Sequence, residues 1–117
     1  MLSIVGNDLY LPKGDTGNLR INISSAYNTT NADRILFTIK KKNTPIIIRV
    51  LTPVNNQAIL EFTNSMTDDL PAGKYRYDIR FIRDAELDSD GLPIDGEGVD
   101  TPHREAVFNL LETVGDV

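Results

Sequence analysis

One segment constrains the fold of this 117-residue chain more than any other. Between residues 74 and 81, apolar and polar side chains alternate strictly. One face takes Tyr75, Tyr77, Ile79 and Phe81, and the other takes Lys74, Arg76, Asp78 and Arg80. A two-residue period is typical of a β-strand with one buried face. The preceding segment 69–73 predicts a turn, because Pro71 fixes φ and Gly73 has a permissive backbone.

The rest of the chain carries the same kind of signal. Six further segments predict strands: 2–11, 19–24, 35–40, 46–51, 58–62 and 106–111. Turn or loop residues separate them at 13–17, 27–33 and 41–44, and 64–69 predicts one short helical turn capped by Asn64 or Ser65. No segment keeps a 3.6-residue apolar period. We therefore expect an all-β chain, a single domain over 1–117, folded as an antiparallel β-sandwich of about seven strands.

The composition excludes several kinds of site and segment. The sequence has no cysteine, which excludes disulfides, thiol catalysis and cysteine-ligated zinc and fits a reducing cytoplasm. The first residues lack the basic and apolar regions of a secretory signal. The longest near-continuous apolar run, 45–51, contains Arg49, so we expect no membrane-spanning segment.

The net charge of −5 is unevenly distributed. Seven of the 17 acidic residues, and no lysine or arginine, lie between residues 84 and 100. The remainder holds ten acids and twelve bases, so nothing favours nucleic-acid binding. We expect a solvated acidic loop at 84–103 and a flexible tail at 113–117.

Two patterns suggest catalysis, and both have simpler interpretations. Asp15-Thr16-Gly17 is the tripeptide of aspartic proteases, but the apolar strand that precedes it in those enzymes is missing, which favours a turn. His103 is the only histidine, and no nucleophile can be paired with it from spacing. We therefore predict no catalytic residue, no cofactor site and no enzymatic activity.

The acidic segment also has the spacing of a calcium loop. Glu86, Asp88, Asp90 and Glu97 take ligand positions 1, 3, 5 and 12, and Gly91 takes position 6. The pattern departs from that motif by a glutamate at position 1, a proline at position 8 and the lack of flanking helices. A solvated acidic hairpin is the favoured interpretation, calcium binding by Glu86–Glu97 stays open, and no metal site is predicted.

Apolar side chains on outward faces suggest association. In 46–51 we expect Ile46, Ile48 and Val50 in the core, with Ile47 and Leu51 facing outward. Other apolar residues expected to face outward are Leu36, Ile59, Ile82, Val107 and Leu111. Several such residues on adjacent strands would form an interface patch. The basic stripe of Lys74, Arg76 and Arg80 is interpreted as a solvated surface.

The order of these features resembles a known family. The resemblance rests on the segments 14–17 (GDTG), 19–23 (LRINI), 35–41 (ILFTIKK), 69–80 (DLPAGKYRYDIR) and 108–110 (FNL). They are similar to small immunoglobulin-like proteins of phages and prophages of Gram-positive bacteria, namely the N-terminal domain of tail baseplate upper proteins and its stand-alone relatives. Gly73-Lys74-Tyr75 resembles the tyrosine corner of immunoglobulin-like sandwiches, whose hydroxyl bonds to the backbone upstream.

This resemblance implies a non-enzymatic virion component, assembled in the bacterial cytoplasm, that docks into a tail or baseplate. The implied partners are other phage structural proteins and further copies of the chain, without nucleic acid or membrane. The alternative is a carbohydrate-binding or cell-surface-binding module, with calcium assistance through the acidic loop left open. Genes for tail or capsid proteins beside the gene for this chain would favour the virion component over the binding module.

Overall fold

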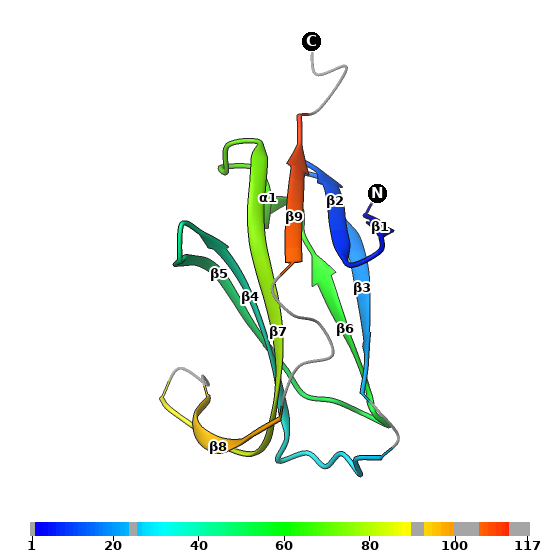
Figure 1. The fold of residues 1–117 in the computed structure, drawn as a ribbon, viewed down its shortest axis with the longest axis vertical. Coiled ribbons are helices and arrows are strands. Elements are labelled where there is room, and N and C mark those ends of the chain that lie inside the picture. Colours follow the sequence, from blue (N-terminus) through cyan, green and yellow to red (C-terminus); the bar gives the residue numbers. More distant parts are fainter. Residues whose placement is uncertain (1, 24–25, 90–92, 100–105, 113–117) are drawn as a thin grey trace.

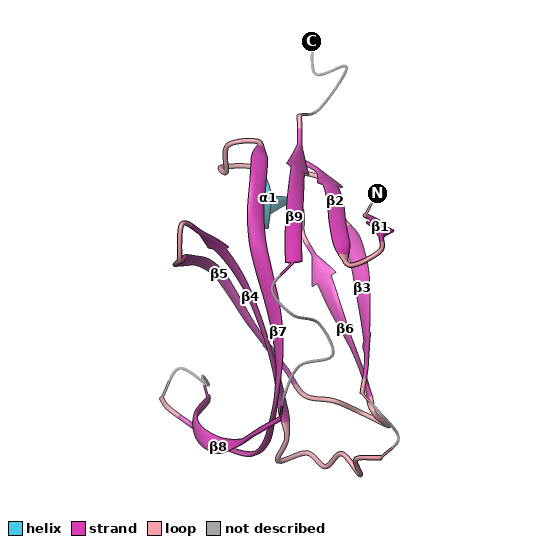
Figure 2. Ribbon diagram, in the orientation of Figure 1, coloured by secondary structure: helices cyan, strands magenta, loops and turns pink. Residues whose placement is uncertain are grey.

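A computed structural model describes residues 2–23, 26–89, 93–99 and 106–112. The chain is nearly all-β, with one short helix (Figure 2). The elements are β1 (Ser3–Val5), β2 (Asp8–Pro12), β3 (Gly17–Asn22), β4 (Arg34–Lys41), β5 (Thr44–Leu51), β6 (Gln57–Phe62), α1 (Asn64–Thr67), β7 (Gly73–Leu87), β8 (Pro93–Val99) and β9 (Ala106–Leu111). In the described part of the chain, no helix has the length and apolar character needed to cross a membrane.

The strands form one large sheet and one small sheet (Figure 1). The large sheet has the order β1-β2-β9-β7-β4-β5, and β8 pairs with β7; the small sheet is the β3-β6 pair. The expected sandwich was antiparallel, but β2 runs parallel to β9, with Leu9 opposite Phe108. The expected first strand, 2–11, is in fact two strands, because Gly6 at φ +61° turns β1 back onto β2.

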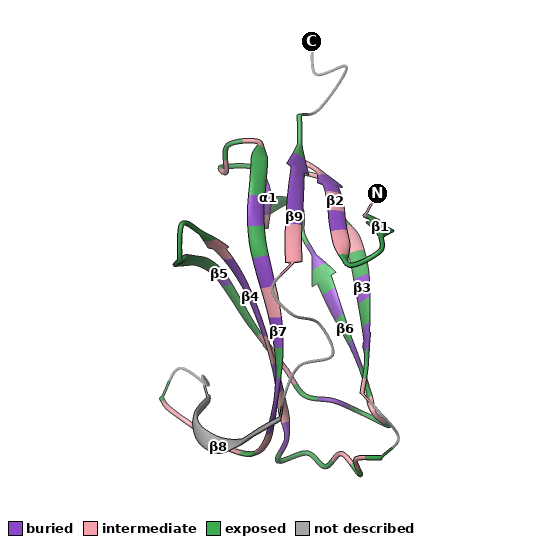
Figure 3. Cartoon of the chain, in the orientation of Figure 1, coloured by how far each residue is buried: buried purple, intermediate pink, exposed green. Residues whose placement is uncertain are grey.

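The hydrophobic core lies between the two sheets. Tyr75, Ile79 and Phe81 of β7 are each 3% exposed, so the predicted aromatic face of this strand is confirmed (Figure 3). Phe62 of β6 packs against rings of the large sheet, with centroids 5.9 Å from Phe37 and 5.8 Å from Phe108. These ring contacts join the sheets across the core.

Two tyrosine hydroxyls of β7 tie the strand to its surroundings. The Tyr75 hydroxyl donates to the carbonyl oxygen of Pro71 at 2.5 Å, which confirms the predicted bond to the backbone upstream. The Tyr77 hydroxyl donates to the carbonyl oxygen of Asn7, in the turn between β1 and β2. Each hydroxyl therefore has a partner although its ring is buried.

The side-chain orientation of β5 is opposite to the expectation. Ile47 is 6% exposed and Leu51 packs against the core, whereas Ile46 and Ile48 are each 39% exposed. A bulge between Ile39 and Lys40 of β4 shifts the register there. In a strand that is apolar on both faces, a one-residue change of register exchanges the two faces.

The segment expected to be an acidic loop is largely strand. Residues 84–87 complete β7, and 93–99 form β8, which pairs with β7. The rest of that expectation, 90–92 and 100–103 including His103, lies outside the described residues, as does the tail 113–117. The short helix was expected, but its N-cap is Thr63 rather than Asn64 or Ser65.

Candidate functional site

Two neighbouring pockets lie along β4, β5 and β7. One has a volume of about 290 Å³ and lies at the turn between β4 and β5, next to the beginning of β7. The other, of about 270 Å³, lies further along the same strands. Lys40 lines both. These pockets form the candidate site.

The pocket of about 290 Å³, here called the basic pocket, is strongly cationic. Its lining is four lysines, one arginine, one asparagine and one tyrosine: Lys40, Lys41, Lys42, Lys74, Arg76, Asn43 and Tyr75. Lys42 and Asn43 have φ of 49° and 68°, the left-handed conformations of a tight hairpin turn. Such a turn presents adjacent lysines at one tip, beside cations from β7.

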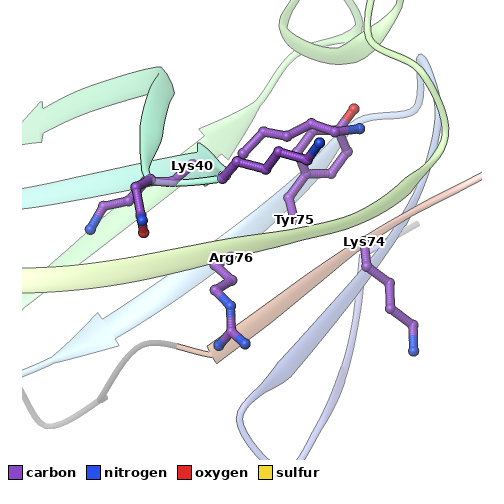
Figure 4. A pocket seen from close by; sticks show the side chains of 7 residues that line it. Lys40, Lys74, Tyr75 and Arg76 are labelled. Carbon is purple, nitrogen blue, oxygen red and sulfur yellow. The ribbon is translucent and has the colours of Figure 1, made fainter.

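Tyr75 and its neighbours lie on different sides of β7 (Figure 4). Lys74 and Arg76 project from one side of the strand, and Tyr75 projects from the other. The Lys41 ammonium lies 4.9 Å from the centroid of the Tyr75 ring, close enough for a cation–π contact. Burial raises the pKa of the Tyr75 hydroxyl above 10.0, so this ring stays neutral around neutral pH.

The second pocket combines apolar and charged side chains. Leu36, Pro45 and Ile48 supply its apolar part. Lys40 forms an ion pair of 2.8 Å with Asp78, and Arg80 and Thr38 complete the lining. Protein interfaces usually combine apolar and charged side chains in this way.

The three cations of the predicted basic stripe are exposed, as the sequence favoured, and they also line the two pockets. Lys74 and Arg76 line the basic pocket, and Arg80 lines the second. Sequence reasoning did not place the lysines of the β4–β5 turn beside this stripe. The relevant signal is cross-strand register, since Lys40 pairs with Arg76.

The apolar residues that were expected to face outward differ in their exposure to solvent. Ile59 and Leu111 are exposed at 54% and 41%, as predicted. Leu36 and Val107 are half-buried. Ile82 is 8% exposed, so the prediction for it is wrong.

The Asp15 motif forms a turn between β2 and β3, as the sequence favoured. The Asp15 carboxylate accepts a hydrogen bond from the Thr16 N–H at 2.9 Å, and the Asp15 N–H donates to the carbonyl of Pro12. A Cβ added to Gly17 would lie 2.7 Å from the Leu2 Cβ, so the glycine here serves close packing.

Glu86 and Glu97 of the calcium pattern lie on the paired strands β7 and β8, whereas Asp90 and Gly91 lie outside the described residues. Backbone register places Glu97 opposite Arg83 and Glu86 opposite Asp95. Glu86 and Glu97, which take positions 1 and 12 of the motif, are therefore not opposite each other on the paired strands. Among the described residues, no group of three or more potential ligands lies close enough to hold a metal ion.

The aromatic residues give no platform for a sugar. All four tyrosines and four phenylalanines lie in the described part of the chain, and none is exposed. Tyr27, which is half-buried, packs edge-on against Phe81 with centroids 5.7 Å apart. Sugar-binding sites usually offer an open aromatic face, so this arrangement does not favour carbohydrate binding.

Asp33 is the residue that sequence reasoning missed most clearly. It is 2% exposed, although it lies at the end of a polar segment. Its carboxylate accepts hydrogen bonds from the N–H groups of Thr30 at 2.9 Å and Asp84 at 3.0 Å. A buried carboxylate with two backbone donors is a structural link, and nothing in the sequence indicates its contact with the distant Asp84.

Comparison of the chain with protein-family models, with curated proteins and with solved structures finds no match.

Proposed function

We propose that the chain is a non-enzymatic docking module with an immunoglobulin-like fold. In such sandwiches, strands C, F and G share one sheet, and strands B and E lie in the other. The adjacent strands β4, β7 and β9 and the separate β3-β6 pair fit these positions in sequence order. The hydrogen bond from Tyr75 to Pro71 fits the tyrosine corner of strand F.

The proposed role is that of a phage or prophage structural or assembly protein, associated with the tail or baseplate. The family resemblance of the sequence supports this role. In this role, the chain docks against other virion proteins and against further copies of itself. Genes for tail or capsid proteins next to its own gene would be the expected context, and a neighbourhood of metabolic genes would contradict it.

One observation carries the docking function: apolar side chains are exposed on an edge strand. β5 pairs only with β4 among the described strands, and its Ile46 and Ile48 are each 39% exposed. Ile48 lines the second pocket together with Leu36 and Pro45. An apolar edge strand invites pairing with another chain unless a partner covers it. We call Leu36, Pro45, Ile46 and Ile48 the apolar patch.

The test is the oligomeric mass of the Ile48→Asp variant. A charge placed in a desolvated interface is costly, so the mass measured by light scattering should fall towards 13.0 kDa while the circular dichroism spectrum is unchanged. Ile59→Asp is the matched control, because Ile59 is exposed on β6 of the other sheet. An unchanged mass for Ile48→Asp, or an equal fall for both variants, would contradict docking through the patch.

A further inference from the structure

Strands β4 and β7 share a continuous face that joins the two pockets. The positions between its residues, such as Phe37 and Tyr77, are buried in the core, so this face lies on the other side of the sheet. It consists of three cross-strand pairs, which we call the β4–β7 face: Lys40 with Arg76, Thr38 with Asp78, and Leu36 with Arg80. All six residues line one or both pockets, and Lys40 belongs to both.

The β4–β7 face carries an excess of positive charge. Among the described residues that line the pockets, Asp78 is the only acid, and it forms an ion pair of 2.8 Å with Lys40. Arg76 and Arg80 add two further cations, and Lys74 continues the same face of β7. Arg76 also has a contact within the chain, so the excess belongs to the face as a whole rather than to one side chain. Clustered cations in a concave surface attract an anionic group.

The β4–β5 turn extends this positive charge beyond the end of β4. Lys41 and Lys42 are both exposed there and line the basic pocket together with Lys74 of β7. The contact of the Lys41 ammonium with the Tyr75 ring, 4.9 Å from its centroid, holds the turn against β7. An anionic group in the basic pocket would therefore meet cations from two separate segments of the chain.

The second pocket places an apolar surface beside these cations. Leu36, Pro45 and Ile48 line it, and Ile48 is 39% exposed. Covering exposed apolar surface is favourable by about 25 cal/mol per Å². The two pockets together can therefore receive an anionic group and an apolar side chain at the same time.

The spacing of the pockets constrains the shape of the ligand. Thr38 lies within the second pocket, opposite Ile48 on one side and Asp78 on the other. Lys41 and Lys42 of the basic pocket follow three and four residues later. At about 3.3 Å per residue, this separation is roughly 10–13 Å. An extended segment lying along β4 would match it with an apolar and an acidic residue about four positions apart, on the same face of the segment.

We propose that the two pockets bind an extended acidic segment of a different protein, with its carboxylates in the basic pocket and an apolar side chain in the second pocket. This inference rests on the proposed function in taking the chain as a docking module, and it names the chemistry of the partner. The β4–β7 face of a second copy would bring the same cations against each other, and juxtaposed like charges are unfavourable. Pairing of copies edge to edge along β5 would leave this face open to the acidic segment.

The first test selects binders from a random dodecapeptide library against the immobilised protein at low salt. The selected peptides should be enriched in aspartate and glutamate, with an apolar residue about four positions from the acidic ones. A library that yields no binder, or binders without this acidic enrichment, would overturn the proposal.

Charge reversal in the basic pocket tests where the acidic residues bind. Lys42→Glu and Lys74→Glu should each raise the Kd of the labelled consensus peptide about tenfold in fluorescence anisotropy, because repulsion replaces attraction. Arg20→Glu is the matched control, since it makes the same charge change at an exposed position of β3 in the small sheet and should leave the Kd unchanged. Equal losses for all three variants would contradict binding in the basic pocket.

The apolar half of the site has its own test. Ile48→Ser should weaken binding of the same peptide several-fold while the circular dichroism spectrum is unchanged, because less apolar surface is covered. Ile59→Ser is the control, because Ile59 is exposed on β6 of the other sheet. At 1 M salt the screening length is about 3 Å, so the wild-type affinity should fall. An affinity that does not respond to salt, or to Ile48→Ser, would overturn the proposed mode of binding.

The outcomes also separate this inference from the proposed function. If Ile48→Asp lowers the oligomeric mass but no acidic peptide is selected, the acidic partner is wrong and the docking role stands. If acidic peptides bind as expected while the mass of Ile48→Asp is unchanged, self-association through the apolar patch is wrong and the acidic partner stands. A fluorescent oligonucleotide that binds more tightly than the peptide, and is lost in Lys42→Glu, would assign the cations to nucleic acid and overturn the proposal.

Discussion

The buried carboxylate of Asp33 accepts a hydrogen bond from the backbone N–H of Asp84, 51 residues later in the chain, at 3.0 Å. At Asp84, β7 has a φ of 48°, and the pairing with β8 shifts register between Arg83 and Glu86. The next residue, Ala85, donates its N–H to the carbonyl of Ala32 at 2.9 Å. The segment before β4 thus anchors β7 in the part that pairs with β8.

We expect Asp33→Ala to lower the free energy of unfolding by about 2–3 kcal/mol, because it leaves the N–H groups of Thr30 and Asp84 without their acceptor. Urea denaturation measures this loss. Asp33→Asn keeps one side-chain oxygen and should lose less. A loss below about 0.5 kcal/mol for the alanine variant would mean that this link contributes little.

Tyr75→Phe should cost about 1 kcal/mol of unfolding free energy, because the ring keeps its packing but loses the hydrogen bond to Pro71. The same substitution at the half-buried Tyr10 is the control and should cost less. Equal costs for both variants would show that the bond to Pro71 adds no stability.

Stability should fall at alkaline pH through the buried tyrosines. Burial raises the pKa of Tyr77 above 10.0, and the charge of Asp8 raises it further; burial also raises the pKa of Tyr75. The unfolded chain therefore releases these protons first as pH passes 10. Their contribution is complete below that pH and is lost as pH rises towards the folded-state pKa values.

Urea denaturation at several pH values between 8 and 11 measures this dependence. Tyr77→Phe removes one of the titrating groups, so the free energy of unfolding should decline less steeply above pH 10 than in the wild type. An identical slope for the two proteins would argue against a raised pKa at Tyr77.

Gly17→Ala should lower the free energy of unfolding by about 1–3 kcal/mol, since the new Cβ would lie 2.7 Å from the Leu2 Cβ and 3.2 Å from its backbone nitrogen. Thermal unfolding detects the loss as a lower Tm. Leu2→Gly removes the nearer atom, so the alanine should cost less in that background. The same cost in both backgrounds would contradict the packing explanation.

Part of the fold and of the site could be predicted because the signals are local. The period of two in β7 predicts its buried face, and the residues around Pro71 and Gly73 predict the turn before it. The lysines of the β4–β5 turn were expected in a turn or loop, and Ile59 and Leu111 were expected on the surface. None of these features requires knowledge of neighbouring strands.

By itself the sequence determined that this chain is a β-protein, where its turns fall, and that its acidic residues concentrate in one segment. Tertiary structure alone decided which face of β5 is buried, that β2 runs parallel to β9, and that Lys42 and Lys74 line one pocket. Alternation and turn propensity act over a few residues, so both can be recognised in the sequence alone. Register and sheet order depend on contacts between distant segments, and those are established only when the strands pack.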